Sequence, residues 1–211
     1  MILLGIHDYG LFVAAGVLLN LTPGQDTLYI VGSSIAYGRR IGVASALGIA
    51  AGCMVHTLAA AVGLSAVLAT SATAFNVIKL AGAIYLIYLG IRALVTPAAV
   101  ASASEHVDSM PTGLAFRRGV VTNVLNPKVA LFFLALLPQF IDSDSPTKVA
   151  AFLALGLTFV ATGTAWCLFL ALSASHVRGY FAEHPRALSH LSRASGALFI
   201  FLGLRLAASE R

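Results

Sequence analysis

The chain has 211 residues, of which 59% are hydrophobic and only 10% are charged, and its formal net charge is +5. Soluble domains carry roughly 25% charged residues, so this composition provides too little polar surface for a water-facing globule. A transmembrane helix takes about 20 apolar residues, so six helices would use about 120 residues and leave room only for short loops. The composition predicts a helical membrane protein and argues against a soluble enzyme or a nucleic-acid binder.

The first apolar block covers residues 9–37 and is interrupted by the sequence Thr-Pro-Gly-Gln-Asp at 22–26. No basic segment precedes the block and no small-residue cleavage site follows it, so we expect this span to remain in the mature protein. Pro23 lacks a backbone N–H and Gly24 weakens a helix. We therefore expect a broken helix with free backbone carbonyls near residues 19–21, which need partners inside a membrane.

Five further apolar blocks follow in the sequence. Residues 41–78 carry no Asp, Glu, Lys or Arg and are too long for one span, so we expect the second helix, a tight turn at 71–76 and the start of the third helix there. The third block ends near Leu94, and residues 96–112 form the longest predicted loop. The fourth and fifth blocks cover 119–141 and 149–174, and the sixth, flanked by Arg193 and Arg205, follows a polar connector at 176–190.

Basic residues are concentrated in alternate loops. The loops after the second and fourth blocks have only Lys79 and Lys148 at their edges, and the basic residues of the other loops are Arg39, Arg40, Arg92, Arg117, Arg118, Arg178, Arg186 and Arg193. Because Lys and Arg favour cytoplasmic loops, both termini are predicted on the outer side of the membrane. Arg205 and Arg211 at the C-terminus oppose this orientation.

Two segments of the chain resemble each other. Residues 81–92 read Ala-Gly-Ala-Ile-Tyr-Leu-Ile-Tyr-Leu-Gly-Ile-Arg, and residues 194–205 read Ala-Ser-Gly-Ala-Leu-Phe-Ile-Phe-Leu-Gly-Leu-Arg. The first and fourth blocks also share a proline, Pro23 and Pro127. These similarities indicate an internal duplication of a three-span unit.

A unit of three spans has its ends on opposite sides of the membrane, so a second copy inserts upside down. Inverted repeats of this kind are the architecture of many secondary transporters. We therefore predict an all-α membrane protein of six transmembrane helices arranged as two inverted three-helix repeats. The repeats are assigned to residues 1–95 and 113–211, with the inter-repeat loop at 96–112.

Asp26 and Lys128 are charged residues inside apolar blocks. A charge at the bilayer centre costs about 2.5–3.5 kcal/mol, so such residues usually face a cavity or a partner. Counted from Arg39 and Arg117, the two residues lie at similar depth, and we expect them to face one cavity between spans one and four, in contact directly or through water. Two plainer alternatives are an early end of span one with Asp26 as a cap, and a purely structural ion pair.

Neutral polar residues accompany these charges at the two breaks. Thr22, Gln25, Asn126 and Asn20 could hydrogen-bond a substrate zwitterion, or could simply satisfy freed backbone groups. Pro23, Gly24 and Pro127 are the expected hinges. The histidines do not have metal-ligand spacing, so neither a metal site nor another cofactor is expected. Cys53 and Cys167 are interpreted as reduced packing residues.

Three motifs together resemble the LysE/RhtB family of amino-acid exporters over essentially the whole chain. They are Leu-Thr-Pro-Gly-Gln-Asp at 21–26, Asn-Pro-Lys at 126–128 and Tyr-Leu-x-Tyr-Leu-Gly-x-Arg at 85–92. The family pattern marks Thr22, Pro23, Gly24, Asp26, Asn126, Pro127 and Lys128, whereas Gln25 stands where a second proline is common. The resemblance implies a secondary transporter, not an enzyme, that exports small amino acids or derivatives across the bacterial inner membrane with energy from the proton gradient.

Other functions remain open at this point. Metal-ion or other small-solute efflux and a passive channel are the alternatives, and an intramembrane enzyme is disfavoured because no second acid, metal cluster or nucleophile lies at the depth of Asp26. The expected partners are a small-molecule substrate, protons and the lipid bilayer, without nucleic acid. A homodimer is left open by the sequence.

Overall fold

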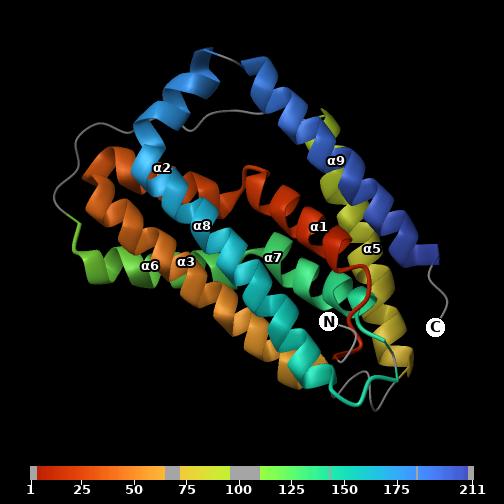
Figure 1. The fold of residues 1–211 in the computed structure, drawn as a ribbon. Coiled ribbons are helices and arrows are strands. Elements are labelled where there is room, and N and C mark those ends of the chain that lie inside the picture. The colour runs from red at the N-terminus through yellow and green to blue at the C-terminus, as the bar shows by residue number, and fades with distance from the viewer. Residues whose placement is uncertain (1–3, 65–71, 96–109, 143, 184, 209–211) are drawn as a thin grey trace.

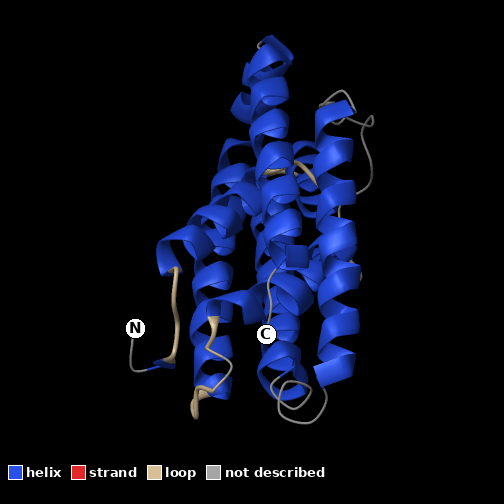
Figure 2. Cartoon of the chain, turned by 90° about the vertical axis from the view of Figure 1, so that its right-hand side faces the viewer, coloured by secondary structure: helices blue, strands red, loops and turns tan. Residues whose placement is uncertain are grey.

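The structure is a computed structural model that describes residues 4–64, 72–95, 110–142, 144–183 and 185–208, and these residues fold almost entirely into helices (Figures 1 and 2). The elements are α1 (Tyr9–Leu21), α2 (Gln25–Tyr37), α3 (Arg39–Ala59), η2 (Ala60–Leu64), α5 (Ala72–Val95), α6 (Thr112–Val124), α7 (Pro127–Leu131), η3 (Phe132–Leu136), η4 (Leu137–Phe140), α8 (Lys148–Glu183) and α9 (Pro185–Ala208). An all-helical membrane protein was predicted, and the all-helical part is confirmed.

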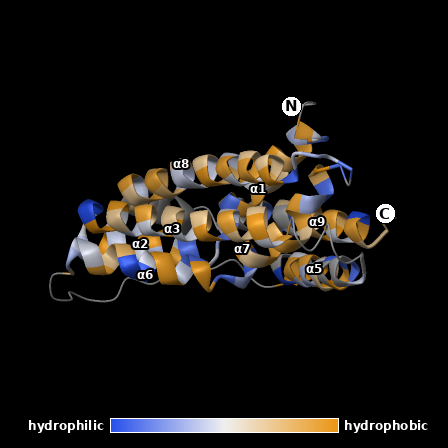
Figure 3. Cartoon of the chain, turned by 90° about the horizontal axis from the view of Figure 1, so that it is seen from below, coloured by the Kyte–Doolittle hydropathy of each residue, from blue (hydrophilic) through white to orange (hydrophobic). Residues whose placement is uncertain are grey.

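Two of the described helices, Arg39–Leu64 and Lys148–Ala174, are long and apolar enough to cross a bilayer. A third crossing results if Thr112–Val124 and Pro127–Phe140, which are bent by 47° at their junction, form one broken span. Hydrophobic residues extend along most of the length of the helices (Figure 3). The described helices thus support two or three spans by length and composition, and the count of six stays a prediction.

Three predicted boundaries were wrong. Residues 72–76 of the expected tight turn already belong to α5, and the helix at the fourth apolar block, α6, begins at Thr112 rather than at residue 119. The described residues of the polar connector before the sixth apolar block are helical, because α8 continues to Glu183 and α9 begins at Pro185. In each case polar or small residues extend a helix beyond its apolar part, which hydropathy does not detect. The inter-repeat loop falls mainly on 96–109, outside the described residues.

Glycines allow α3 and α6 to approach each other closely. A Cβ built at Gly48 would collide with the backbone carbonyl of Phe116. It would also lie 3.1 Å from the Cα atom of Gly119. One turn further along, a Cβ at Gly52 would lie 2.8 Å from the Cβ of Asn123. Small residues at this spacing let two helix backbones come together in a membrane protein.

The two similar segments lie side by side, in α5 and α9 (Figure 1). A Cβ at Gly90 would lie 2.7 Å from the carbonyl oxygen of Gly196 and 2.6 Å from Ile200 Cγ1. A Cβ at Gly203 would lie 2.9 Å from the carbonyl oxygen of Ala83 and 2.8 Å from Ile87 Cγ1. In the alignment of the two segments, Gly90 corresponds to Gly203, and Ala83 and Ile87 correspond to Gly196 and Ile200. The contacts are therefore reciprocal, as they are across a local two-fold axis.

The buried apolar residues form two clusters. One contains Phe12, Phe132 and Phe152 and joins α1, η2, α5, η3, η4, α9 and the first half of α8, with single residues from α3 and α7. The other joins α2, α3 and the second half of α8, and contains Ile30 and Leu170. The helices on either side of the first break therefore belong to different clusters, α1 to the first and α2 to the second. The break between α1 and α2 lies where the two clusters meet.

The two ends of the described chain lie near each other. Arg205 near the end of α9 donates a hydrogen bond to Asp8 Oδ2 at the start of α1, at 2.6 Å. The N-terminal segment is also attached to the segment after η4, because Asp142 N donates to Gly5 O at 2.8 Å and Ser145 Oγ donates to Leu4 O at 3.1 Å. Chain termini on the same side of a membrane are expected when the number of membrane crossings is even.

We expect Gly48→Ala to destabilise the protein by about 1–3 kcal/mol, since an added methyl in a packed helix crossing must displace backbone. The matched control is Gly32→Ala in α2, where an added Cβ meets nothing within 4 Å. This control should be neutral or slightly stabilising, because Ala is a better helix former than Gly by about 1 kcal/mol. Thermal unfolding in detergent measures both, and equal melting temperatures would contradict the close crossing of α3 and α6.

The bond from Arg205 lowers the pKa of the Asp8 carboxyl from its ordinary value of 3.8, against a smaller opposing effect of desolvation. A lowered pKa contributes stability that is complete above the unfolded-state pKa and is lost as pH falls through the folded-state pKa. Asp8→Asn should therefore lower the melting temperature at neutral pH, and the difference from wild type should shrink below about pH 3.8. A difference that is constant across this range would contradict the bond.

Candidate site between the two broken helices

The first break separates α1 from α2 at Thr22, Pro23 and Gly24. The last carbonyls of a helix have no partner within it and carry the negative end of the helix dipole. Thr22 Oγ1 donates back to Leu18 O at 2.6 Å. Lys128 Nζ donates to Leu19 O at 3.1 Å and to Thr22 O at 3.0 Å. The expected free carbonyls are therefore present, and a cation from the second half of the chain binds them.

Gly24 leaves the space that the Lys128 side chain occupies. A Cβ at Gly24 would lie 3.1 Å from Lys128 Nζ and 3.5 Å from Cε, so the ammonium group passes directly over the glycine. The φ angle of Gly24 is −157°, which is extended backbone that any residue adopts. The glycine is therefore explained by the lack of a side chain at this close approach.

Asp26 lies in the first turn of α2. A carboxylate is stabilised at a helix N-terminus, where the free N–H groups carry partial positive charge. Asn123 Nδ2 in α6 donates to Asp26 Oδ2 at 2.8 Å, while Asp26 Oδ1 is buried and has no partner. One carboxylate oxygen is thus used by the protein and the other is free.

The second break separates α6, which ends at Val124, from α7, which begins at Pro127. Asn126 is the N-cap of α7, and its Oδ1 accepts from Lys128 N at 3.0 Å. Proline is well tolerated at the first position of a helix, where its missing N–H has no partner to lose. His56 Nε2 in α3 lies 3.1 Å from the carbonyl oxygen of Asn123, an acceptor, so this nitrogen carries the proton.

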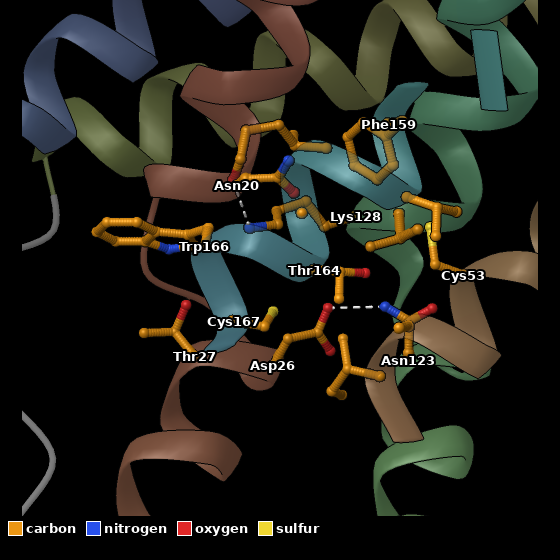
Figure 4. A pocket seen from close by; sticks show the side chains of 16 residues that line it. Asn20, Asp26, Thr27, Cys53, Asn123, Lys128, Phe159, Thr164, Trp166 and Cys167 are labelled. Atoms are coloured by element: carbon orange, nitrogen blue, oxygen red, sulfur yellow. Dashed lines mark hydrogen bonds between the residues drawn. The ribbon is translucent and has the colours of Figure 1, made fainter. Parts of the chain in front are cut away.

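A cavity lies between the two breaks. Its volume accessible to water-sized molecules is about 40 Å³, which holds at most a few waters. Figure 4 shows Asp26 and Asn123 joined by a hydrogen bond, with Lys128 on the other side of Thr164. The cavity is lined by Leu19, Asn20, Asp26, Thr27, Ile49, Ala50, Cys53, Asn123, Lys128, Val129, Phe159, Val160, Gly163, Thr164, Trp166 and Cys167. Side chains of both apolar clusters, such as Leu19 and Ile49, meet the polar side chains of the two breaks at this cavity.

Buried polar atoms without partners gather around this cavity. Among the described residues eight buried side-chain nitrogen or oxygen atoms have no hydrogen-bond partner, and five of them belong to lining residues. Those five are Asn20 Nδ2, Asp26 Oδ1, Asn123 Oδ1, Thr164 Oγ1 and Trp166 Nε1. Buried polar groups are normally paired, because an unpaired one costs about 1–3 kcal/mol. Both donors and acceptors are thus available to a small polar molecule.

The predicted site residues have different surroundings. Asp26 and Lys128 line the cavity as expected, but Thr22, Gln25 and Asn126 are not among its lining residues. Thr22 and Asn126 bond to the backbone at the breaks, which was the plainer of the two alternatives for them. Gln25 is exposed.

Asp26 and Lys128 both line the cavity but do not form a direct ion pair. Within the part of the chain that the structure describes, the ion pairs of 4.0 Å or less join His7, Asp8, Asp142 and Arg205, and none joins Asp26 to Lys128. Of the two expected forms of contact, the direct one is therefore absent and the one through water stays a prediction. Each charge has a hydrogen-bond partner of its own in the other half of the chain. In the early-cap alternative, Asp26 caps the end of span one. The first helix does end at Leu21, but Asp26 lies in the first turn of α2, whose N-cap is Gly24.

Sequence reasoning missed several lining residues. Asn123, Thr164 and Trp166 were not singled out, although each is a polar side chain inside an apolar block. Cys53 and Cys167 are free and buried, and both line the cavity. No group of three or more His, Cys, Asp or Glu side chains that could hold a metal ion occurs among the described residues.

The sequence model of the LysE type translocator family matches residues 17–210 of the chain. This chain belongs to the LysE translocator family. It is 32% identical to the homoserine/homoserine lactone efflux protein of Salmonella typhimurium, over 94% of this chain and 95% of that protein. It is 29% identical to the leucine efflux protein of Klebsiella pneumoniae, over 98% and 97% of the two chains.

A third relative of this LysE-family protein is an uncharacterized membrane protein of Vibrio cholerae, with 30% identity over 97% of this chain and 98% of the relative. No solved structure shows significant similarity to the chain. The predicted family is confirmed, and with it a membrane translocator.

We expect Lys128→Met to lower the stability by about 2 kcal/mol, because two carbonyls at the end of α1 lose a charged donor. The matched control is Lys148→Met, since Lys148 Nζ also donates to one carbonyl, Ser145 O, at 3.1 Å, but at the start of α8. The control should cost less than about 1 kcal/mol, because Lys148 is half-buried and makes one such bond instead of two. Equal losses in thermal unfolding would show that the Lys128 bonds are not special.

Proposed function

We propose that the chain is a secondary exporter of small amino acids or their derivatives across the bacterial inner membrane, driven by the proton gradient. The observation that carries this proposal is the set of five unpartnered polar atoms around one buried cavity. An amino acid is a zwitterion, and its ammonium group needs acceptors while its carboxylate needs donors. Relatives named for efflux of homoserine, homoserine lactone and leucine also support an amino-acid substrate.

The acceptors and donors of the cavity come from different elements. Asp26 Oδ1 in α2 and Asn123 Oδ1 in α6 are free to accept from an ammonium group. Asn20 Nδ2 in α1 and Trp166 Nε1 in α8 are free to donate to a carboxylate. Lys128 has three N–H donors and uses two, so the third is available as well.

Proton coupling follows from competition for Asp26. The free carboxylate oxygen can bind either the substrate ammonium group or a proton, but not both. Release of an amino acid on the outer side and protonation of Asp26 there would then be linked steps, and the protonated carboxyl would carry the proton inward. This exchange requires no second site.

Alternating access is supported by the small cavity and by the two breaks. About 40 Å³ is too small for an amino acid, since ligand sites usually measure about 300–1,000 Å³, so the helices must move apart to admit one. The hinges we assign are Pro23, Gly24 and Pro127. The reciprocal contacts of Gly90 and Gly203 support the two inverted repeats that such a movement exchanges.

The test is efflux from proteoliposomes loaded with a panel of labelled amino acids, with an acidic exterior. We expect one or a few amino acids to leave faster when the proton gradient is present. Asp26→Asn should reduce that rate about 10- to 100-fold, because a charged hydrogen bond contributes about 1.5–3 kcal/mol. Asp142→Asn, which changes an exposed carboxylate outside the cavity, is the control and should behave as wild type.

Two outcomes would contradict the proposal. No transport of any amino acid by correctly inserted wild-type protein would remove the amino-acid function and favour metal-ion or other solute efflux. Transport that is independent of the proton gradient and insensitive to Asp26→Asn would leave a passive channel with its pathway elsewhere.

A further inference from the structure

A second cavity lies next to the first, between α1 and α8. It is lined by Val17, Asn20, Leu21, Thr162, Ala165, Trp166 and Phe169, and its volume accessible to water-sized molecules is about 280 Å³. The residues from α8 are spaced by three and four positions and therefore share one face of that helix. We call this second cavity the α1–α8 groove.

The groove is apolar although it contains Thr162. The hydroxyl of Thr162 donates within its own helix, at 3.0 Å to Thr158 O and 3.1 Å to Phe159 O, so it is satisfied and leaves the groove without a polar demand. Trp166 and Phe169 stack with ring centroids 5.4 Å apart and an interplanar angle of 25°. The groove thus has an aromatic wall on α8 and aliphatic side chains on α1.

Asn20 and Trp166 line both the groove and the polar cavity. Each carries a buried donor without a partner. Gly163 allows the Asn20 amide to lie against α8, because a Cβ at that position would be 3.3 Å from both amide atoms. The boundary between the polar and the apolar space is therefore formed by two free N–H donors.

We propose that the α1–α8 groove holds the side chain of the transported amino acid and selects for apolar side chains. This inference rests on the proposed function. A carboxylate bound by Asn20 and Trp166 at the boundary places the α-carbon between the two spaces. The ammonium group then extends toward Asp26 and Asn123, and the side chain extends into the groove.

The test is counterflow in proteoliposomes with the series alanine, 2-aminobutyrate, norvaline and norleucine. Each added methylene that enters an apolar groove should increase apparent affinity about three- to fourfold in the wild type. Ala165→Leu, which adds bulk inside the groove, should abolish this increase. Ala161→Leu is the matched control, because Ala161 is exposed on the same helix and does not line the groove.

Val17→Ala provides the opposite change. It widens the groove from the α1 side. The apparent affinity should therefore keep rising for a side chain one methylene longer than the longest that still gains affinity in the wild type. This variant keeps the proposal testable if Ala165→Leu folds poorly, and it carries no added bulk.

The outcomes separate the groove from the transport function. Transport of amino acids without any dependence on side-chain length, or a dependence that survives in Ala165→Leu, overturns the groove and leaves the proposed function intact. A lipid chain in the groove predicts that Ala165→Leu slows every substrate by the same factor. Failure of wild-type protein to exchange any amino acid overturns both.

Discussion

The structure depends on how two interrupted helices satisfy their backbone groups in apolar surroundings. In a membrane an unpaired carbonyl or N–H has no water to turn to, so a break is stable only where protein groups replace the lost partners. Lys128 does this for α1, by donating to Leu19 O and Thr22 O. The bonds join residues more than one hundred positions apart, so they also hold the two halves of the chain together.

The two breaks are stabilised in different ways. The first needs donors for carbonyls, and a long cationic side chain from the other half supplies them at the negative end of the α1 dipole. The second needs an acceptor for an N–H, and Asn126 supplies it locally as the N-cap of α7. An ammonium group at a helix C-terminus and a carboxylate at a helix N-terminus are both favoured by the helix dipole, so Lys128 and Asp26 each have a favourable position without contacting one another.

The surrounding helices pack closely around the cavity between the two breaks. Gly48 and Gly52 bring α3 against α6, so that Asn123 reaches Asp26, and the contacts of Gly90 and Gly203 bring α5 against α9 at the far side. Side chains of both apolar clusters line this cavity as well. A buried polar atom without a partner is costly. A polar ligand that hydrogen-bonded to the five free atoms in the cavity would remove that cost.

The sequence by itself determined the helical class, the position of both breaks and the presence of Asp26 and Lys128 beside a common cavity. These follow from local properties, namely apolar runs, the missing N–H of proline, and the cost of a buried charge. Helix ends were predicted less well, since the polar extensions of α6 and α8 carry no hydropathy signal.

Only the tertiary structure decided which groups pair. The sequence indicated that Asp26 and Lys128 share a cavity, but it did not indicate that Asn123 bonds the carboxylate while the ammonium group caps α1. It also did not distinguish Trp166 and Thr164 from ordinary residues of an apolar helix. Such pairings depend on the rotation and crossing of helices distant in sequence, which are set by the packing of whole faces and by a few glycines rather than by any local pattern.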